Sequence, residues 1–238
     1  MTDVSWKPLI SDVPWKPMAA AAVCSYALGS LSPAAGAARL RKADLRGTGS
    51  GNPGATNAAR TMGVGVGVTV GALDVAKGFV PTWYFGRYGQ PCGEIAGLSA
   101  VLGHVTSPLL KGRGGKGVAT SLGAILAEQP LWAVPVLGTF GVTLKLTHQM
   151  GIGSVAGTAT LLPASFVVWE GWAGVGFAVG LTAIVVSRHR RNIGAFVAAR
   201  GSGRPASGRR AAAASGAGVA PTVDSPASPP EATPRASL

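Results

Sequence analysis

The stretch GWAGVGFAVGLTAIVVS, residues 171–187, contains no charged side chain and is long enough to cross a lipid bilayer as a helix. Four more windows without charge lie upstream, at residues 17–38, 95–110, 129–144 and 146–169. The chain is 47% hydrophobic and only 13% charged, whereas an ordinary soluble domain has about 25% charged residues. The sequence therefore predicts an all-α, polytopic integral membrane protein.

The apolar segments number about seven, and each is expected to be a transmembrane helix. The fourth is the weakest, because it is short and ends at Glu128-Gln129-Pro130, so it could form a tight helical hairpin with the fifth. Five full spans with re-entrant pieces is the main alternative. The seven segments are 18–38, 62–85, 94–110, 117–129, 130–146, 151–169 and 171–187.

Lysines and arginines are unevenly divided between the two sides of the predicted membrane domain. Cytoplasmic loops of membrane proteins carry an excess of these residues, which predicts a topology with the N-terminus outside and the C-terminus in the cytoplasm. The segments that then lie outside carry only Lys7, Lys16 and Arg87. The inside segments 39–61, 111–116, 145–150 and the tail from residue 188 carry five, three, one and eight.

The two ends of the chain flank the membrane domain. We expect a short N-terminal segment at 1–17, the membrane-embedded domain at 18–198 and a disordered cytoplasmic tail at 199–238, since Ala, Ser, Pro, Gly and Arg dominate the tail. The net charge of +12 resides in loops and tail rather than in a basic stripe with interleaved aromatics, so no nucleic-acid partner is expected. The two cysteines lack CxxC spacing, and no metal site is predicted.

A glycine-rich loop, GTGSGNPGATNAAR, lies at residues 47–60 between two apolar segments. Glycines let backbone N–H groups approach an anion closely, and an arginine offers a bidentate fork to its oxygens. Part of the loop satisfies the dinucleotide-binding pattern G-x-G-x-x-G, but that pattern needs a preceding strand, and an apolar helix is expected here. The loop therefore predicts a site for a phosphate group rather than for a dinucleotide.

Two further basic elements are expected on the same face of the membrane. KGRGGKG, residues 111–117, intersperses charge with glycines and lacks the Ser or Thr that follows the lysine of a P-loop. RHRRNI, residues 188–193, follows the last apolar segment. Positive-inside flanking explains the charge of both elements, but not the four glycines interspersed with the charges of the first, which favour an anion cradle. Three such elements on one face indicate a single anion-binding site.

Polar residues also occur within the predicted helices. Asp74 and Lys77 lie on one face of the second apolar segment, where they either tie helices together as an ion pair or take part in catalysis. Ser154 either helps the sixth segment to pack or contributes to the phosphate site. His148 lies beside an inner loop, at the expected interface.

The motifs GSGNPGATNAAR, GHVTSPLLKGRGGKGVAT and RHRRNI resemble, in this order, the three signature motifs of the bacterial acyl-phosphate-dependent glycerol-3-phosphate acyltransferases, the PlsY family. The resemblance covers residues 20–195. It implies an enzyme of the bacterial cytoplasmic (inner) membrane, with its active site at the cytoplasmic face, that transfers an acyl group from acyl phosphate to the 1-hydroxyl of glycerol 3-phosphate. It also implies lysophosphatidic acid and phosphate as products, no cofactor, and the lipid bilayer and the enzyme that makes acyl phosphate as partners.

The sequence departs from the family pattern at three places. Val105-Thr106 stands where an aromatic residue is usual after the histidine of the second motif, and Gly112 replaces another aromatic. Gly194-Ala195-Phe196 follows the third motif in place of a glycine–glutamate signature. These differences bear on the substrate pocket and on the tail, not on the reaction.

The candidate site residues follow from the motifs and from the chemistry of a mixed anhydride, whose good leaving group makes a covalent nucleophile unnecessary. No G-x-S-x-G elbow and no HxxxxD signature is present. We expect Arg60 and Lys116 to clamp phosphate, and either His104 or His189, or the substrate phosphate itself, to accept the hydroxyl proton. The predicted catalytic residues are Ser50, Lys116, His104 and His189. The predicted phosphate-binding residues, with the backbone amides of 49–54 and 112–117, are Gly49, Gly51, Asn52, Gly54, Thr56, Asn57, Arg60, Gly114, Gly115, Ser154 and Asn192.

A membrane transporter of a small phosphorylated anion is the alternative function. It would share the helices, the basic loops and the intramembrane Asp74 and Lys77. It predicts polar residues along the whole transport path, whereas the outer halves of the predicted spans are mostly Ala, Val, Leu and Gly. The sequence therefore favours the enzyme.

Overall fold

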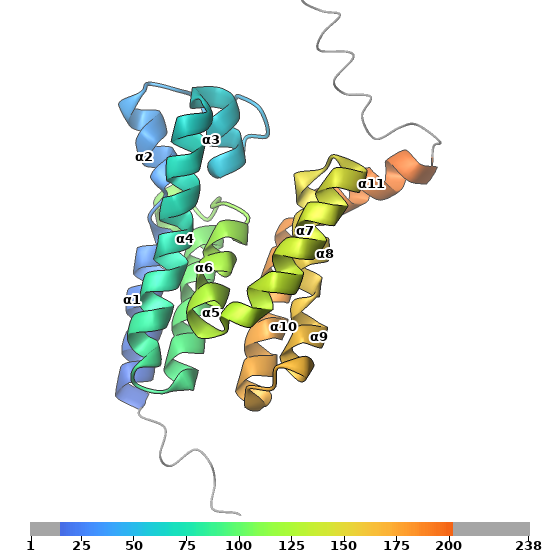
Figure 1. The fold of residues 1–238 in the computed structure, drawn as a ribbon. Helices are drawn as coiled ribbons and strands as arrows, with labels where there is room; N and C mark the ends of the chain where they lie inside the picture. The colour runs from blue at the N-terminus through green and yellow to red at the C-terminus, as the bar shows by residue number, and fades with distance from the viewer. Residues whose placement is uncertain (1–14, 202–238) are drawn as a thin grey trace, which may run out of the picture.

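The computed structural model describes residues 15–201, and every regular element within that range is a helix (Figure 1). The predicted N-terminal segment and tail lie outside the described residues, apart from residues 15–17 and 199–201, which are helical rather than extended or disordered. The α-helices are α1 (Trp15–Ser30), α2 (Pro33–Leu40), α3 (Ala55–Met62), α4 (Val64–Gly86), α5 (Gln90–Thr106), α6 (Val118–Glu128), α7 (Ala133–Thr147), α8 (Met150–Ala159), α9 (Leu161–Val167), α10 (Gly171–Arg188) and α11 (Arg190–Gly201), with single 3-10 turns η1 (Pro108–Leu110) and η2 (Pro130–Trp132).

All seven predicted apolar segments are helical, but they differ in length. Four stretches are long and apolar enough to cross a membrane: Trp15–Leu40, Val64–Gly86, Met150–Val167 and Gly171–Arg188. Helix α6 has 11 residues, about 16 Å of helix, against a hydrocarbon core of about 30 Å. It therefore does not span alone, and it forms an open hairpin with α7 across η2 (Figure 1).

Two of the predicted helices are interrupted at prolines. The segment 18–38 is divided, because α1 ends at Ser30 and α2 begins at Pro33, with the Ser32 hydroxyl accepting from the N–H of Ala35 at 3.2 Å as an N-cap. The segment 151–169 is divided at Thr160, three residues before Pro163. A proline has no N–H to continue the preceding helix, so each of these two segments consists of two shorter helices, although each remains long and apolar enough to cross a membrane.

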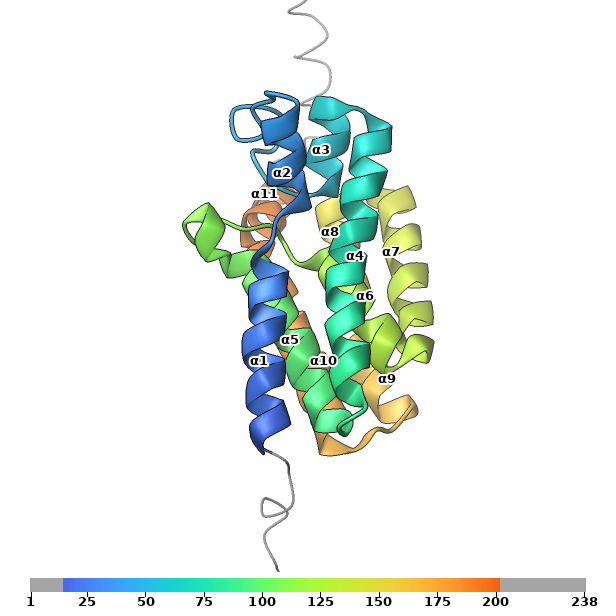
Figure 2. The same ribbon diagram turned by 90° about the vertical axis from the view of Figure 1, so that its left-hand side faces the viewer.

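The first six helices form one layer, and α7 to α11 form a second layer beside it (Figures 1 and 2). Within the first layer, Gly78 of α4 faces the backbone of Thr120, and Gly123 of α6 faces the backbone of Val75, so a side chain at either glycine would overlap the opposite helix. This close approach is typical of membrane helices. The layers are joined by a buried apolar cluster that includes Val101, Ile125, Trp132, Leu161, Phe177 and Leu181.

The two ends of the molecule differ in composition. Exposed aromatic residues lie where α1 begins, where α4 ends and where α9 meets α10; they are Trp15, Trp83, Tyr84, Tyr88, Trp169 and Trp172. Tryptophan and tyrosine of this kind are enriched at membrane–water interfaces. The predicted motifs occupy the opposite end, together with α2, α3 and α11 (Figures 1 and 2). The fold therefore collects the candidate functional residues at one end of the bundle.

Candidate active site

The three motifs meet at the basic end of the bundle. The Thr56 hydroxyl of α3 lies 3.5 Å from the Met150 sulfur at the start of α8. The Lys116 Nζ, between α5 and α6, donates to the Asn192 Oδ1 of α11 at 2.7 Å. Arg46 donates from Nη2 to the Arg113 carbonyl at 2.5 Å and so joins the first loop to the second. Residues as far apart in the chain as Arg46 and Asn192 are thereby brought to one end of the molecule.

Asn57 organises the first glycine-rich loop from within. Its side chain is buried, with Nδ2 donating to the carbonyls of Leu45 at 2.9 Å and Thr48 at 3.2 Å, while Oδ1 accepts from the Ser50 N–H at 2.9 Å. Gly49 has φ +59°, and a Cβ there would overlap the Asn57 Oδ1. The sequence predicted Asn57 as a phosphate-binding residue. In the structure both polar ends of its amide are engaged by the loop, so the side chain shapes the loop.

The predicted anion ligands of the first motif lie around the start of α3. Gly54 is the N-cap, and no side chain caps this helix, so the N–H groups of Ala55 and Thr56 are available to an anion. The N–H groups of Ser50, Gly51 and Gly54 donate instead within the loop, to the Asn57 Oδ1 and to the carbonyls of residues 48 and 52, so the predicted cradle of amides 49–54 is largely occupied. Ser50, Thr56 and Arg60 have exposed side chains. The predicted ligands Gly51, Asn52 and Gly54 lie in the same turn, and Gly51 has φ +65°. This end of α3 can accommodate a phosphate group.

The second glycine-rich loop uses its backbone amides differently from the prediction. The N–H groups of Gly114 and Gly115 donate to the carbonyls of Val105 at 3.2 Å and His104 at 3.1 Å, and those of residues 112 and 113 bond to carbonyls of residues 107 and 110. Amides 112–115 therefore cap the end of α5 and are not free for phosphate, so the predicted cradle of amides 112–117 does not extend over this part. The glycines instead allow the loop to lie against α5.

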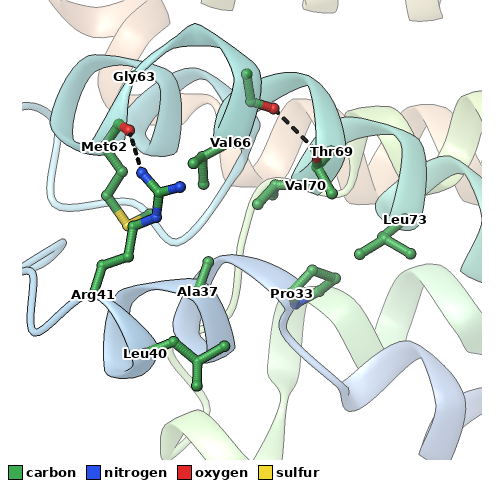
Figure 3. A pocket seen from close by; sticks show the side chains of 11 residues that line it. Pro33, Ala37, Leu40, Arg41, Met62, Gly63, Val66, Thr69, Val70 and Leu73 are labelled. Carbon is green, nitrogen blue, oxygen red and sulfur yellow. Dashed lines mark hydrogen bonds between the residues drawn. The ribbon is translucent and has the colours of Figure 1, made fainter.

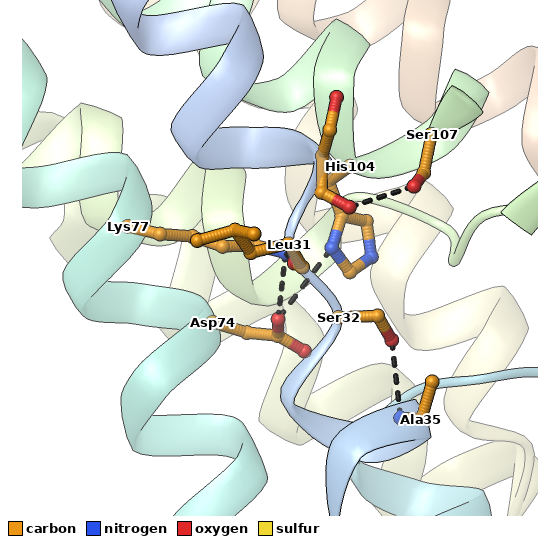
Figure 4. Close-up of polar contacts among 8 residues, drawn as sticks. Leu31, Ser32, Ala35, Asp74, Lys77, His104 and Ser107 are labelled. Atoms are coloured by element: carbon orange, nitrogen blue, oxygen red, sulfur yellow. Dashed lines mark hydrogen bonds and ion pairs between the residues drawn. The ribbon is translucent and has the colours of Figure 1, made fainter. Parts of the chain in front are cut away.

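His104 is enclosed on both sides of its ring. Nδ1 lies 3.5 Å from the Asp74 Oδ1 (Figure 4), and a Cβ at Gly115 would overlap Nε2. Asp74 also pairs with the Lys77 Nζ at 3.0 Å, and that ammonium donates to the Leu31 carbonyl at 2.8 Å, at the break between α1 and α2. All three side chains are buried. The His104 ring is therefore packed between Asp74 and the second loop.

His189, at the end of α10, has one defined ring proton. Its Nδ1 lies 2.8 Å from the Val185 carbonyl, and because a carbonyl oxygen only accepts, Nδ1 carries the hydrogen. Burial lowers the pKa of His189, the Val185 bond opposes this, and the charges of Lys116 and Arg188 lower the pKa further. The ring is therefore neutral near pH 7, with an unprotonated Nε2 that can accept a hydroxyl proton.

Positive charge is concentrated beside His189. Burial lowers the pKa of Lys116, and the neighbouring charges of Arg188 and Arg60 lower it further. The Arg188 guanidinium donates to the carbonyls of Gly115 at 3.3 Å and Gly114 at 3.2 Å, and so holds the second loop against α10. Within residues 15–201 none of these three cations has a carboxylate within 4 Å. A cationic cluster without acidic partners is suited to a doubly charged phosphate group.

Two predicted ligands come from the second layer of helices. Asn192 accepts from Lys116, and its side chain packs on Gly151 of α8. Ser154, one turn further along α8, is buried and donates its hydroxyl to the Met150 carbonyl at 2.8 Å, so it has only lone pairs left and is not a phosphate donor in this arrangement. Arg46 and Arg188 were not predicted as individual site residues, although Arg46 directly precedes the first glycine-rich loop and Arg188 is the first residue of the third motif.

Comparisons with known proteins agree with this arrangement. The family described as glycerol-3-phosphate acyltransferase matches residues 19–199. Curated proteins named glycerol-3-phosphate acyltransferase include that of Thermoanaerobacter pseudethanolicus, 37% identical over 155 residues (64% of this chain and 78% of the relative). That of Geobacter sulfurreducens is 37% identical over 171 residues (71% and 88%).

Solved structures give the same result at the level of the fold. The chain is similar to the crystal structure of PlsY (YgiH), an integral membrane glycerol 3-phosphate acyltransferase, in its glycerol 3-phosphate form, with a TM-score of 0.74 and 32% sequence identity over 77% of this chain and 93% of that one. The lysophosphatidic acid form of the same protein matches with a TM-score of 0.72 and 31% identity over the same shares.

Proposed function

Because the chain belongs to the glycerol-3-phosphate acyltransferase family of the PlsY type, we propose that it transfers a fatty acyl group from acyl phosphate to the 1-hydroxyl of glycerol 3-phosphate. The chain is an integral membrane acyltransferase of phospholipid synthesis on this family evidence. The acyl phosphate donor, the products lysophosphatidic acid and phosphate, and the residue roles below are the content of the proposal.

One observation carries the proposal: Arg60, Lys116 and Arg188 lie together with no carboxylate within 4 Å among residues 15–201. The reaction brings together two substrates that each carry a phosphate group. Binding of these anions relieves the mutual repulsion of the three clustered cations. The start of α3, next to Gly54, provides the first N–H groups of the helix, those of Ala55 and Thr56, as donors for one of the phosphates. Arg60 and Lys116 are the proposed clamp.

The proposed chemistry is a direct acyl transfer. The 1-hydroxyl oxygen of glycerol 3-phosphate attacks the acyl carbonyl carbon, the bond between that carbon and the bridging phosphate oxygen breaks, and inorganic phosphate leaves. The hydroxyl proton passes to Nε2 of His189. Ser50 and Asn192 orient the substrates, and positioning of this kind supplies about 7–11 kcal/mol of barrier reduction without a covalent intermediate.

The proposed setting is the bacterial cytoplasmic membrane, with the site at the cytoplasmic face. The basic motif end supports this orientation, because positively charged loops remain in the cytoplasm, and the aromatic residues at the other end mark the outer interface. Acyl phosphate is reactive, so the enzyme that makes it is a reasonable partner at that face. The family assignment also favours an enzyme over the transporter considered from the sequence.

The test is phosphate release from acyl phosphate by the full chain in lipid vesicles. We expect release that requires glycerol 3-phosphate and neither CoA nor ATP, with formation of lysophosphatidic acid. Lys116→Ala should lower the rate by about 10-fold or more, since charge-assisted hydrogen bonds contribute about 1.5–3 kcal/mol. The matched control is Lys145→Ala, an exposed lysine at the end of α7. Transfer only from acyl-CoA, or equal rates for Lys116→Ala and the control, would overturn the proposal.

A further inference from the structure

A groove lies between α2 and the first turns of α4 (Figure 3). It has a volume of 430 Å³, within the usual range of about 300–1,000 Å³ for ligand pockets. Its walls are apolar: Ala37 and Leu40 come from α2, Val66 and Leu73 from α4, and Met62 closes one end. The motifs and the proposed reaction do not use this groove.

The groove opens toward the surroundings of the bundle rather than into its core. Leu40 is 88% exposed and Leu73 50% exposed, and a Cβ added at Gly65 would meet nothing within 4 Å. One wall is α4, which is long and apolar enough to span a membrane. An apolar groove on such a helix faces lipid chains, because the surroundings of a membrane-spanning helix are lipid.

A single guanidinium lies at the mouth of the groove. Arg41 donates from Nη1 to the Met62 carbonyl at 3.1 Å, which uses one of the five N–H groups of an arginine. Within residues 15–201 no carboxylate lies within 4 Å of Arg41, and Arg39 and Lys42 add charge beside it. An apolar channel that ends at an unpaired arginine matches an acyl chain attached to an anionic head group.

The groove is separate from the proposed acyl-transfer site. Met62 and Arg60 are two residues apart on α3, about 200° around the helix axis. Met62 packs with α2 and α4, whereas Arg60 lies near Lys116 on the other side. A phosphate held by Arg60 would therefore not place its acyl chain in this groove without passing around α3.

We propose that this groove binds one acyl chain of an anionic membrane phospholipid, with the lipid phosphate on Arg41. The site does not depend on the identity of the acyl donor. A zwitterionic phospholipid has the same acyl chains but carries a positive group beside its phosphate, so its binding gains less from the charge of Arg41.

The experiment is native mass spectrometry of the full chain in detergent with added phosphatidylglycerol or phosphatidylcholine. The wild type should retain one phosphatidylglycerol with about 5-fold higher affinity than phosphatidylcholine, because the choline cation offsets the phosphate charge that attracts Arg41. Arg41→Gln should remove this preference. Val66→Trp, which fills the groove, should weaken retention of both lipids.

Matched controls keep the test specific. Arg39→Gln removes a neighbouring charge, and Val64→Trp adds the same ring two residues earlier on α4, where the side chain is 73% exposed and lies outside the groove. Both should bind like the wild type, and all four variants should keep acyl transfer and thermal stability. Retention of phosphatidylglycerol by Arg41→Gln or by Val66→Trp equal to that of the wild type would overturn the proposal, as would displacement of the lipid by acyl phosphate or by a second copy of the chain.

Discussion

Replacing His189 by Asn tests the role of the Nε2 atom separately from that of Nδ1, because the structure fixes the orientation of the imidazole ring. The Asn amide nitrogen reaches the position of Nδ1, so the 2.8 Å bond to the Val185 carbonyl is kept, while the proton acceptor at Nε2 is lost. If Nε2 accepts the hydroxyl proton, kcat should fall by about 10²–10⁴-fold, the usual contribution of general base catalysis. If Nε2 only accepts a hydrogen bond, the loss should be about 10-fold or less.

The pH profile gives a second reading of the same group. Burial and the neighbouring Lys116 and Arg188 lower the pKa of His189. The neutral imidazole, which acts as the base, is therefore already the main form at slightly acidic pH. The rate of the wild type should therefore rise with pH through that acidic range and level off before pH 7. The rising limb should be absent in His189→Asn.

The assay is phosphate release by the full chain in vesicles at saturating substrates. His148→Asn is the control, because His148 is exposed at the same end of the bundle and has φ +54°, a backbone conformation that Asn tolerates. A loss of 10-fold or less in His189→Asn would assign the proton to the substrate phosphate. Full loss of transfer in a folded His104→Gln, with His189→Asn active, would refute the choice between the two histidines.

Three further predictions concern the frame of the site. Gly115→Ala should destabilise the chain by about 1–3 kcal/mol, because the new Cβ overlaps the buried imidazole of His104. Gly194→Ala is the control and should be neutral, because a Cβ there meets nothing within 4 Å. Thermal unfolding in detergent measures both variants, and equal melting temperatures would contradict the close contact between Gly115 and His104. Asn57→Ala should cost about 3 kcal/mol, from three lost hydrogen bonds at about 1 kcal/mol each, and raise KM for both substrates; unchanged KM in a folded variant would remove the loop from the site. Asp74→Asn should destabilise by about 3–5 kcal/mol, since it leaves a buried Lys77 without its partner, and the added change Lys77→Met should restore part of the loss; no recovery in the double variant would show that the pair is not the source.

The fold was largely predictable from where charge is missing. Windows such as 171–187 lack charged residues because each would be costly in lipid, and each became a helix. The interruptions at Pro33 and near Pro163 were missed, because hydropathy averages over a window and does not register a single missing N–H. The short α6 was correctly identified as the weakest segment, because Pro130, two residues after its end, was visible in the sequence.

That the three motifs come together was also predictable, because the predicted topology places all of them on the same face of a small helical bundle. Which partner each polar group of the motifs binds was not predictable. Whether the amides of Gly114 and Gly115 face a phosphate or cap α5 depends on which carbonyl lies within 3.2 Å, and that is decided by the tertiary approach of the loop to His104 and Val105. The sequence pattern is the same in both cases.

The basic residues at the motif end of the bundle have two different roles. Arg46 and Arg188 each donate to backbone carbonyls of another segment, so these two cations of the motif end also tie segments together. A guanidinium suits this task, because its several N–H groups can satisfy carbonyls left unpaired at helix ends and loops. Lys116 differs, since its hydrogen bond is to the neutral amide of Asn192 and its charge remains uncompensated. An incoming phosphate therefore gains most from Lys116 and Arg60, and substitutions there should affect catalysis more than stability, whereas Arg46→Gln and Arg188→Gln should affect both.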